Sequence, residues 1–586
     1  MAKREGWAAM MTVAVLGCST AASSTGTDDS LSIGSTMTEA STKDTIGATA
    51  ETLGPTTGLS EPAPTTSPTG EVTTGEASTG VGPSACGMDI APGPTIVHTS
   101  GGAIEGEQLA DVVAFRGVRY AEPPVGDLRF RPPQPRMCVP ELTPAIELGP
   151  RCPQVEKNAQ GQVTAMLGDE DCLTLNVWTP ATGDAGRPVL VFIHGGGNAT
   201  GGSDDGLYDG AALAAAQDVV VVTLNYRLGA LGFLTHDTLA AESPEQVSGN
   251  YGILDQVLAL QWVQDNIAGF GGDPQRVLLF GESAGAVNTC SLVGSPRATG
   301  LFQRAIVQSG SCSERALAKY EADIAALWVA ASGCADAACL RALSVSEILT
   351  LQPDGYPDVA ALGQGWGPHV DGAVIPKPVL SAMSEGTHNA MPLVFGANAE
   401  ETAKGVPPLT VPQYEALVQA TFGPQAAMVL AQYPAADYGD DGQAAYVALT
   451  SDLKFICGAR RAARAADAGQ VAPVFRYHFA YDGYETPPNT AAAAFHGLEL
   501  VYIFASWGAV LPDPLEYEPN ADDLAISQRL QSAWARFAAT GDPAGADLTW
   551  PAYVGADDNG ALLDEPPDLF IGVRTQQCDF WDMLLP

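Results

Sequence analysis

The stretch Val277–Val287, VLLFGESAGAV, decides the fold of this 586-residue chain. An apolar run typical of a buried strand ends in Gly-Glu-Ser-Ala-Gly, and small helix-forming residues follow directly. This is the G-x-S-x-G pattern, in which a sharp turn from strand to helix exposes a serine hydroxyl above a parallel sheet. Gly281 and Gly285 suit such a turn because strand and helix approach too closely there for side chains. Ser283 is therefore a candidate nucleophile.

The sequence around this stretch alternates between strand and helix patterns. Pro188–His194 and Asp218–Leu224 are apolar throughout, as expected of parallel strands that are covered on both faces. Asn250–Phe270 carries apolar residues at helical spacing. Further strands are predicted at Phe302–Ser309, Met391–Phe395 and Pro473–Phe479. The pattern predicts an α/β fold with a large, mostly parallel central sheet flanked by helices, and Ala-rich segments between the later strands predict helical cap insertions.

A strand is also expected around Leu173, Leu175 and Val177. These apolar residues alternate with polar ones, which predicts a strand with one buried face and one exposed face.

Composition excludes several classes of function. The chain has 28 Lys and Arg against 67 Asp and Glu, a formal net charge of -39, which argues against binding to nucleic acid. Its 11 cysteines lack the paired spacing of zinc sites, so disulfides in an oxidising compartment are the better interpretation. No nucleotide-binding pattern occurs in the glycine run Gly195–Gly202. We therefore expect no metal and no cofactor.

The N-terminus is typical of an exported protein. Two basic residues precede the apolar run Trp7–Gly17, which is too short to span a bilayer. The run ends at Leu-Gly-Cys18, which resembles the lipobox of bacterial lipoproteins. Residues 1–18 are thus interpreted as a lipoprotein signal peptide with lipidation at Cys18, on the bacterial outer membrane or cell surface. The alternative is an ordinary signal peptide cleaved near Ala21, which would give a secreted or periplasmic protein.

Two further parts follow the predicted signal peptide. Residues 19–85 are Thr, Ser, Gly, Pro and Glu with almost no large apolar residue, which predicts a disordered tether. Residues 86–586 form the globular domain. No later segment resembles a transmembrane helix, so membrane attachment is expected only through the lipid.

A nucleophilic serine needs a base, an acid that orients the base, and backbone donors for the oxyanion. In hydrolases built on this turn, the chain order is Ser, acid, His. His496, in AFHGLE, follows the last predicted sheet strands of this region at a junction of loop and helix. It is the candidate base.

From about Pro94 to its end, the chain resembles the type-B carboxylesterases, a family that also includes cholinesterases and the non-catalytic neuroligins. The resemblance is carried by a series of motifs in order: EDCLTLNVW, HGGG, NYRLGALGFL, GNYGILDQ, FGGDPQRVLLFGESAGA, FQRAIVQSG and FHGLELVYIF. It implies an α/β-hydrolase fold and a triad of Ser283, Glu401 and His496 that works through an acyl-enzyme. Glu400 is the alternative acid.

The resemblance also implies an oxyanion hole and part of the pocket. The backbone N–H groups of Gly196, Gly197 and Ala284 would form the hole, and Glu282 would be a pocket carboxylate. The family usually has an aromatic residue after the glycine run, where this chain has Asn198. A more polar or roomier pocket mouth is the resulting hypothesis.

Two other expectations come from the family. Cholinesterases hold a quaternary ammonium against an aromatic ring in the loop before Cys172. Here Pro153–Asp171 contains no Trp, Tyr or Phe, so a choline ester is not the expected substrate. The implied disulfide pairs are Cys152–Cys172, Cys334–Cys339 and Cys457–Cys578. Cys86 with Cys138 is a possible fourth pair, Cys290 is expected to be a small buried hydrophobe, and no pair is expected for Cys312.

The main hypothesis is an exported, lipid-tethered carboxylic-ester hydrolase that acts on a small-molecule ester. The alternative is a catalytically silent surface adhesion module of the neuroligin type. Retention of Ser283, Glu401 and His496 together favours the enzyme. These patterns define neither the natural ester nor the oligomeric state.

Overall fold

The computed structural model describes residues 89–158, 162–183, 185–351, 365–483, 493–507 and 517–584. The predicted signal peptide, the predicted tether, the lipidation site Cys18 and the cysteine Cys86 lie outside these ranges.

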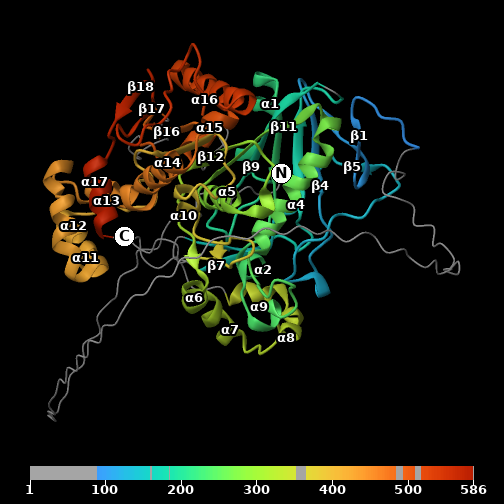
Figure 1. Ribbon diagram of the computed structural model, residues 1–586, viewed down its shortest axis with the longest axis horizontal. Helices are drawn as coiled ribbons and strands as arrows, with labels where there is room; N and C mark the ends of the chain where they lie inside the picture. Colours follow the sequence, from blue (N-terminus) through green and yellow to red (C-terminus); the bar gives the residue numbers. More distant parts are fainter. Residues whose placement is uncertain are drawn as a thin grey trace, which may run out of the picture. The chain divides into compact units, whose positions relative to one another are not determined.

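The described residues are built on a mixed sheet of 11 strands in the order β18-β17-β16-β15-β12-β11-β9-β10-β8-β4-β3 (Figure 1). All neighbours from β10 to β17 in this order pair in parallel, whereas β8, β4 and β3 at one end and β18 at the other pair antiparallel. The prediction of a large, mostly parallel central sheet is confirmed. The strands are β3 Glu107–Gln108, β4 Val113–Arg119, β8 Thr174–Thr179, β9 Arg187–Ile193, β10 Val220–Leu224, β11 Gly272–Glu282, β12 Arg304–Gln308, β15 Leu393–Asn398, β16 Val474–Phe479, β17 Asn559–Leu563 and β18 Asp568–Ile571.

Helices cover both faces of the sheet because successive side chains of a strand point to opposite sides. Val189, Val191 and Ile193 of β9 face a core that includes α4, α5 and α14, while Leu190 and Phe192 face a second core formed with α1, α15 and α16. The helices are α1 Ala211–Gln217, α4 Tyr251–Asn266, α5 Ala284–Gly294, α14 Cys457–Gly469, α15 Leu498–Phe504 and α16 Ala521–Thr540. The sheet is thus the middle of three layers.

Most of the remaining helices lie in insertions between strands, as predicted for the cap, whereas α17 follows the last strand of the sheet. Figure 1 shows α6 to α9 grouped together, and α11, α12, α13 and α17 grouped around a third apolar core. These helices are α6 Leu317–Tyr320, α7 Ala326–Ser332, α8 Ala337–Ala342, α9 Val345–Thr350, α11 Val411–Phe422, α12 Ala426–Gln432, α13 Gly442–Ser451 and α17 Thr575–Leu584. The short helices α2 Gly229–Phe233, α3 Asp237–Ala240 and α10 Val379–Ser384 complete the set within the described ranges.

Small sheets flank the main one. They consist of β1 Ile96–Thr99, β2 Gly102–Glu105 and β5 Thr143–Pro144, of the pair β13 Arg315–Ala316 and β14 His369–Val370, and of the hairpin β6 Gln154–Lys157 and β7 Val163–Leu167. Among the helices that the structure describes, none is long and apolar enough to cross a membrane.

The prediction of a half-exposed strand at Leu173–Val177 is wrong. All six residues of β8 are buried, because the strand is an inner member of the sheet and is covered on both faces. Its polar residues are satisfied internally: Asn176 Nδ2 donates to the carbonyl oxygen of Ser203 (3.1 Å) and to Thr223 Oγ1 (3.1 Å). An alternating pattern therefore reflected buried hydrogen bonds and not exposure to solvent.

The structure contains the three disulfides implied by the family: Cys152–Cys172, Cys334–Cys339 and Cys457–Cys578. The expectation for the other two cysteines of the domain is wrong, since Cys290 and Cys312 form a fourth disulfide with Cα atoms 5.5 Å apart. Cys290 is on α5 and Cys312 follows β12, and these two elements pack against each other. Cys138 is also disulfide-bonded, but its predicted partner, Cys86, is outside the described residues.

Candidate active site

Ser283 lies at a strained turn between β11 and α5. Its backbone has φ 58° and ψ -121°, a conformation that non-glycine residues adopt only when the surrounding structure imposes it. A Cβ on Gly281 would collide with the carbonyl oxygen of Gly285, and a Cβ on Gly285 would collide with that of Ile193 in β9. Both glycines are therefore required by the close approach of strand and helix, as expected for this motif.

His496 and Glu401 are joined by a short hydrogen bond. The Nδ1 atom of His496 lies 2.6 Å from Glu401 Oε2, and the N–H group of His496 donates to the backbone carbonyl of Glu401 (3.0 Å). The other oxygen, Oε1, accepts the N–H of Asn398 at the end of β15 (2.8 Å). Glu401 is almost fully buried. The carboxylate thus orients the imidazole ring.

The alternative acid, Glu400, points elsewhere. Its Oε2 accepts the N–H of Ala494 (3.0 Å), and its pKa is raised by burial. The structure places Glu401, and not Glu400, on the imidazole of His496.

Two more carboxylates surround His496. Glu282 is buried, and its Oε1 lies 3.0 Å from His496 Nε2. Glu499 is also buried; it accepts hydrogen bonds from Gln308 Nε2 (3.1 Å) and from Asn398 Nδ2 (2.6 Å). The role of Glu499 was missed in the sequence, although an ionisable residue inside the apolar run FHGLELVYIF was an available signal.

Burial and charge shift the titration of this cluster. Burial raises the pKa of Glu282 to about 8, with a smaller opposing effect of His496. Burial, reinforced by Glu401, raises the pKa of Glu499 to about 7. For His496, burial alone would lower the pKa, but the carboxylates of Glu282 and Glu401 outweigh it and raise the pKa to about 9. The buried carboxylates around His496 therefore favour its protonated form.

The glycine loop after β9 packs against the turn that carries the serine. A Cβ on Gly195 would lie 3.0 Å from the Cβ of Ser283. Gly196 and Gly197 have φ values of 104° and 64°, which favour glycine. Within the described ranges, the N–H groups of Gly196 and Ala284 donate to no acceptor. They can donate to a developing oxyanion, and the oxyanion hole formed by Gly196, Gly197 and Ala284 stays a prediction.

Gln154 holds the far end of this loop. Its Nε2 donates to the carbonyl oxygens of Gly201 (2.7 Å) and Cys152 (3.0 Å), and its Oε1 accepts the N–H of Gly201 (3.0 Å). The near end is held by Tyr226, whose hydroxyl donates to the carbonyl oxygen of His194 (2.9 Å). Neither role could be seen in the sequence, because each bond joins segments that are far apart in the chain.

Asn198 is turned into the protein. It is buried, and its Oδ1 accepts a hydrogen bond from Asn288 Nδ2 on α5 (2.8 Å). Its φ of 55° is left-handed, a conformation that asparagine tolerates better than most residues. The side chain thus braces the glycine loop against α5, and the hypothesis of a more polar or roomier pocket mouth stays a prediction.

Phe455 covers the imidazole. It belongs to a π-helical turn, Asp452–Ile456, and its ring centroid lies 4.5 Å from that of His496 with the planes tilted by 39°. Such turns interrupt α-helices mainly at functional sites. Here the turn brings an aromatic ring onto the base.

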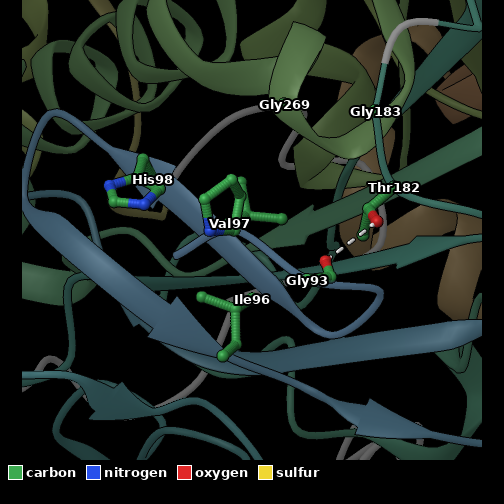
Figure 2. Close-up of a pocket in the computed structure, with 8 residues that line it drawn as sticks. Gly93, Ile96, Val97, His98, Thr182, Gly183 and Gly269 are labelled. Carbon is green, nitrogen blue, oxygen red and sulfur yellow. Dashed lines mark hydrogen bonds between the residues drawn. The ribbon is translucent and has the colours of Figure 1, made fainter. Parts of the chain in front are cut away.

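One cavity in the described residues lies away from this site. It measures about 410 Å³ and lies between β1 and the turn at Thr182, where the Thr182 hydroxyl donates to the carbonyl oxygen of Gly93 (3.4 Å; Figure 2). His98 is the one titratable residue in its lining. None of the predicted site residues borders it, so we assign the chemistry to the Ser283 region on the basis of hydrogen-bond geometry. The described residues include no group of three His, Cys, Asp or Glu arranged to hold a metal ion.

A serine at a strand-to-helix elbow and a histidine bound to a buried carboxylate, on a sheet of this topology, are the features of an α/β hydrolase. The chain belongs to the carboxylesterase family, whose sequence profile matches residues 93–581. It is therefore a carboxylesterase, which acts on small-molecule esters.

Similar proteins agree with this assignment. The chain is 36% identical to fumonisin B1 esterase of Sphingopyxis macrogoltabida over 466 residues, which is 78% of this chain and 84% of that protein. It is 34% identical to para-nitrobenzyl esterase of Bacillus subtilis over 475 residues (80% and 94%). A solved structure of a PNB esterase superposes with a TM-score of 0.71 at 30% identity and covers 83% of this chain and all of that one. The alternative of a silent adhesion module is not favoured by these relatives.

Proposed function

We propose that the protein hydrolyses carboxylic esters through a triad of Ser283, His496 and Glu401. The observation that carries the proposal is the 2.6 Å bond between His496 Nδ1 and Glu401. The other ring nitrogen of His496 lies 3.0 Å from Glu282, the residue before Ser283 in the strained elbow turn. A base oriented by a buried carboxylate can take the proton of a serine hydroxyl, which is too weak a nucleophile by itself.

The reaction proceeds in two halves. His496 Nε2 accepts the proton of Ser283 as the serine oxygen attacks the ester carbon, and the carbonyl π electrons move to its oxygen. The N–H groups of Gly196, Gly197 and Ala284 stabilise that oxyanion, each by about 3 kcal/mol. When the intermediate collapses, the alkoxide leaves with the proton from His496. Water then repeats the sequence on the acyl-enzyme, which releases the acid and restores the serine.

Glu282 sets the protonation state from which the reaction starts. His496 Nε2 must be unprotonated to act as a base, yet Glu282 Oε1 lies 3.0 Å from it in a buried position. His496 Nε2 must therefore lose its proton before the enzyme is active.

We infer that the substrate is not a choline ester. The segment between Cys152 and Cys172 contains the hairpin of β6 and β7 and no aromatic side chain. A quaternary ammonium group therefore has no aromatic ring to contact in this segment.

We also propose that the protein is exported and tethered by lipid at Cys18, on the bacterial outer membrane or cell surface. The lipobox-like sequence supports this proposal, and four disulfides within the described residues fit an oxidising compartment. Expression of the full chain with Cys18→Ser tests it: the parent should fractionate with membranes and carry a lipid by mass spectrometry, and the variant should not. Equal release of both would support the secreted or periplasmic alternative.

The catalytic proposal is tested with a panel of p-nitrophenyl esters. Ser283→Ala should lower kcat by about 10⁶-fold, as removal of a triad nucleophile does elsewhere. Glu401→Gln should lower it by about 10⁴-fold, because the wrong imidazole tautomer is then favoured. Glu400→Gln is the matched control and should change kcat by less than about threefold, since Glu400 bonds to Ala494 instead. An inactive parent would contradict the proposal and favour the adhesion module.

A further inference from the structure

Lys404 is on the turn that presents the acid of the triad. Glu401 opens this turn, and the N–H groups of Gly405 and Val406 close it by donating to the carbonyl oxygen of Thr402 (3.0 and 3.1 Å). The Thr402 hydroxyl is in turn 2.6 Å from Thr450 Oγ1 on α13. Lys404 therefore extends from a fixed position three residues after Glu401.

The ammonium group of Lys404 lies over the ring of Phe495. Its Nζ is 4.7 Å from the ring centroid of Phe495, and Phe495 immediately precedes His496. Phe495 is itself held in place, because its carbonyl oxygen accepts Asn398 Nδ2 (2.7 Å). A positive charge over this ring is thus positioned on the same segments that carry Glu401 and His496.

No carboxylate among the described residues lies within 4.0 Å of Lys404, and its ammonium donates no hydrogen bond to them. This is unusual in a chain with 67 acidic and 28 basic residues. The exposed lysines Lys319 and Lys377, by contrast, bind Asp323 (3.0 Å) and Glu385 (2.7 Å). An ammonium without a carboxylate partner, on the turn that presents Glu401, is available to a ligand.

The surroundings of Lys404 differ from those of an ordinary surface lysine. The side chain is exposed, yet enough protein lies around it for burial to lower the pKa of the ammonium. Solvent and ligands therefore reach the ammonium, while it loses part of its hydration. A charge pair formed with a partly desolvated ammonium is stronger than one with a fully hydrated ammonium.

We propose that Lys404 is a specificity-determining residue that binds a carboxylate carried by the ester substrate, so that the enzyme prefers anionic esters over neutral ones. The inference rests on the proposed function. Glu282, Glu401 and Glu499 around His496, together with the net charge of -39, make the site unfavourable for an anion. The cation of Lys404, over the ring of the residue before His496, offsets that repulsion for an ester whose second carboxylate reaches it.

The test uses two pairs of esters that differ only in whether a carboxylate is free or methylated. Mono-4-nitrophenyl glutarate and its methyl ester place the group on the acyl side, and 3-acetoxybenzoate and its methyl ester place it on the alcohol side. The enzymes are the parent, Lys404→Met, which keeps an apolar stem without the charge, and Lys404→Arg, which keeps the charge. Lys377→Met is the matched control, because it removes one exposed lysine charge elsewhere.

We expect the parent to prefer the free carboxylate in one pair, which identifies the side of the ester that faces Lys404. Lys404→Met should lower kcat/KM for that anionic ester by about tenfold, or about 1.4 kcal/mol, and change the methyl ester by less than about twofold. Lys404→Arg and Lys377→Met should retain the preference, and added salt should weaken it.

The inference is overturned if Lys404→Met changes the anionic and methylated esters equally, or changes neither, while the parent hydrolyses the methylated esters. A parent that is inactive on all four esters would overturn the proposed function and this inference with it. The methylated esters thus separate the two failures.

Discussion

Gln154 binds both the N–H and the carbonyl of Gly201, with its side-chain amide acting as a second peptide group (3.0 and 2.7 Å). Gln154 is buried and comes two residues after Cys152, whose disulfide to Cys172 closes the neighbouring loop. The glycine loop that carries the predicted oxyanion donors is therefore fixed to a disulfide-closed loop. Preorganised donors of this kind stabilise a transition state without reorganisation.

Replacing Gln154 with leucine should lower kcat more than it raises KM. Loss of both bonds frees the Gly201 end of the loop, and a donor displaced by about 1 Å costs about 10²-fold in rate. Steady-state kinetics on a neutral p-nitrophenyl ester measure the split. Gln264→Leu is the matched control. Gln264 is on α4, and its Nε2 also donates to two carbonyl oxygens, those of Pro274 (2.8 Å) and Leu301 (2.9 Å). If both variants lose stability alike and keep their kcat, Gln154 has no positioning role.

Glu282→Gln should move the acidic limb of the pH–rate profile to lower pH. The carboxylates of Glu282 and Glu401 stabilise the imidazolium and raise the pKa of His496 to about 9. Activity requires neutral His496 and so rises as pH rises through that pKa; removing one anion lowers the pKa and shifts the rise downward. Glu400→Gln removes a nearby charge that does not contact His496 and should leave the limb in place. A limb that is unchanged in Glu282→Gln, or moved upward, would show that Glu282 does not hold the proton.

Local patterns in the sequence predicted the strand-to-helix turn that carries Ser283. Gly281, Ser283 and Gly285 are neighbours in the chain, and the turn they form is set by steric contact over a few residues. The assignments of Glu401 and His496 came from the family's order of motifs, and the structure brings these two side chains into contact. Such features are readable because each depends on residue type at a fixed spacing.

What escaped prediction depends on contacts across the chain. Gln154 and Gly201 are 47 residues apart, and no local pattern marks a glutamine as a partner of a distant peptide group. β17 and β18 were missed because they are short and separated by an acidic, proline-containing turn, and they gain their hydrogen bonds only at the edge of the assembled sheet. The buried face of β8 was misjudged because its polar residues are paired inside the protein.

Asp255→Asn should destabilise the fold without changing the chemistry of ester hydrolysis. Arg227, in the NYRLG motif, binds Asp255 on α4 through two charged hydrogen bonds (2.8 and 2.7 Å), and both side chains are buried. Removing one charge leaves the other buried without a partner, which typically lowers the free energy of unfolding by about 3–5 kcal/mol. The midpoint of urea unfolding should fall accordingly. The exposed pair Arg297–Glu245 provides the control, since Glu245→Gln should leave the midpoint unchanged. Equal midpoints for the two variants would mean that the buried pair contributes nothing specific.

Removal of the Cys290–Cys312 disulfide should also lower the free energy of unfolding, and it offers a direct test of the pairing. Cys290 and Cys312 are separated by 22 residues, and closing such a loop contributes about 3 kcal/mol by restricting the unfolded chain. The double variant Cys290→Ala, Cys312→Ala should unfold at lower urea than the double variant of Cys334 and Cys339, whose loop of 5 residues contributes about 2 kcal/mol. Peptide mapping of the unreduced parent should recover a cross-linked Cys290–Cys312 peptide. Two free thiols at these positions would instead restore the sequence-based expectation that Cys290 is a small apolar residue buried in α5.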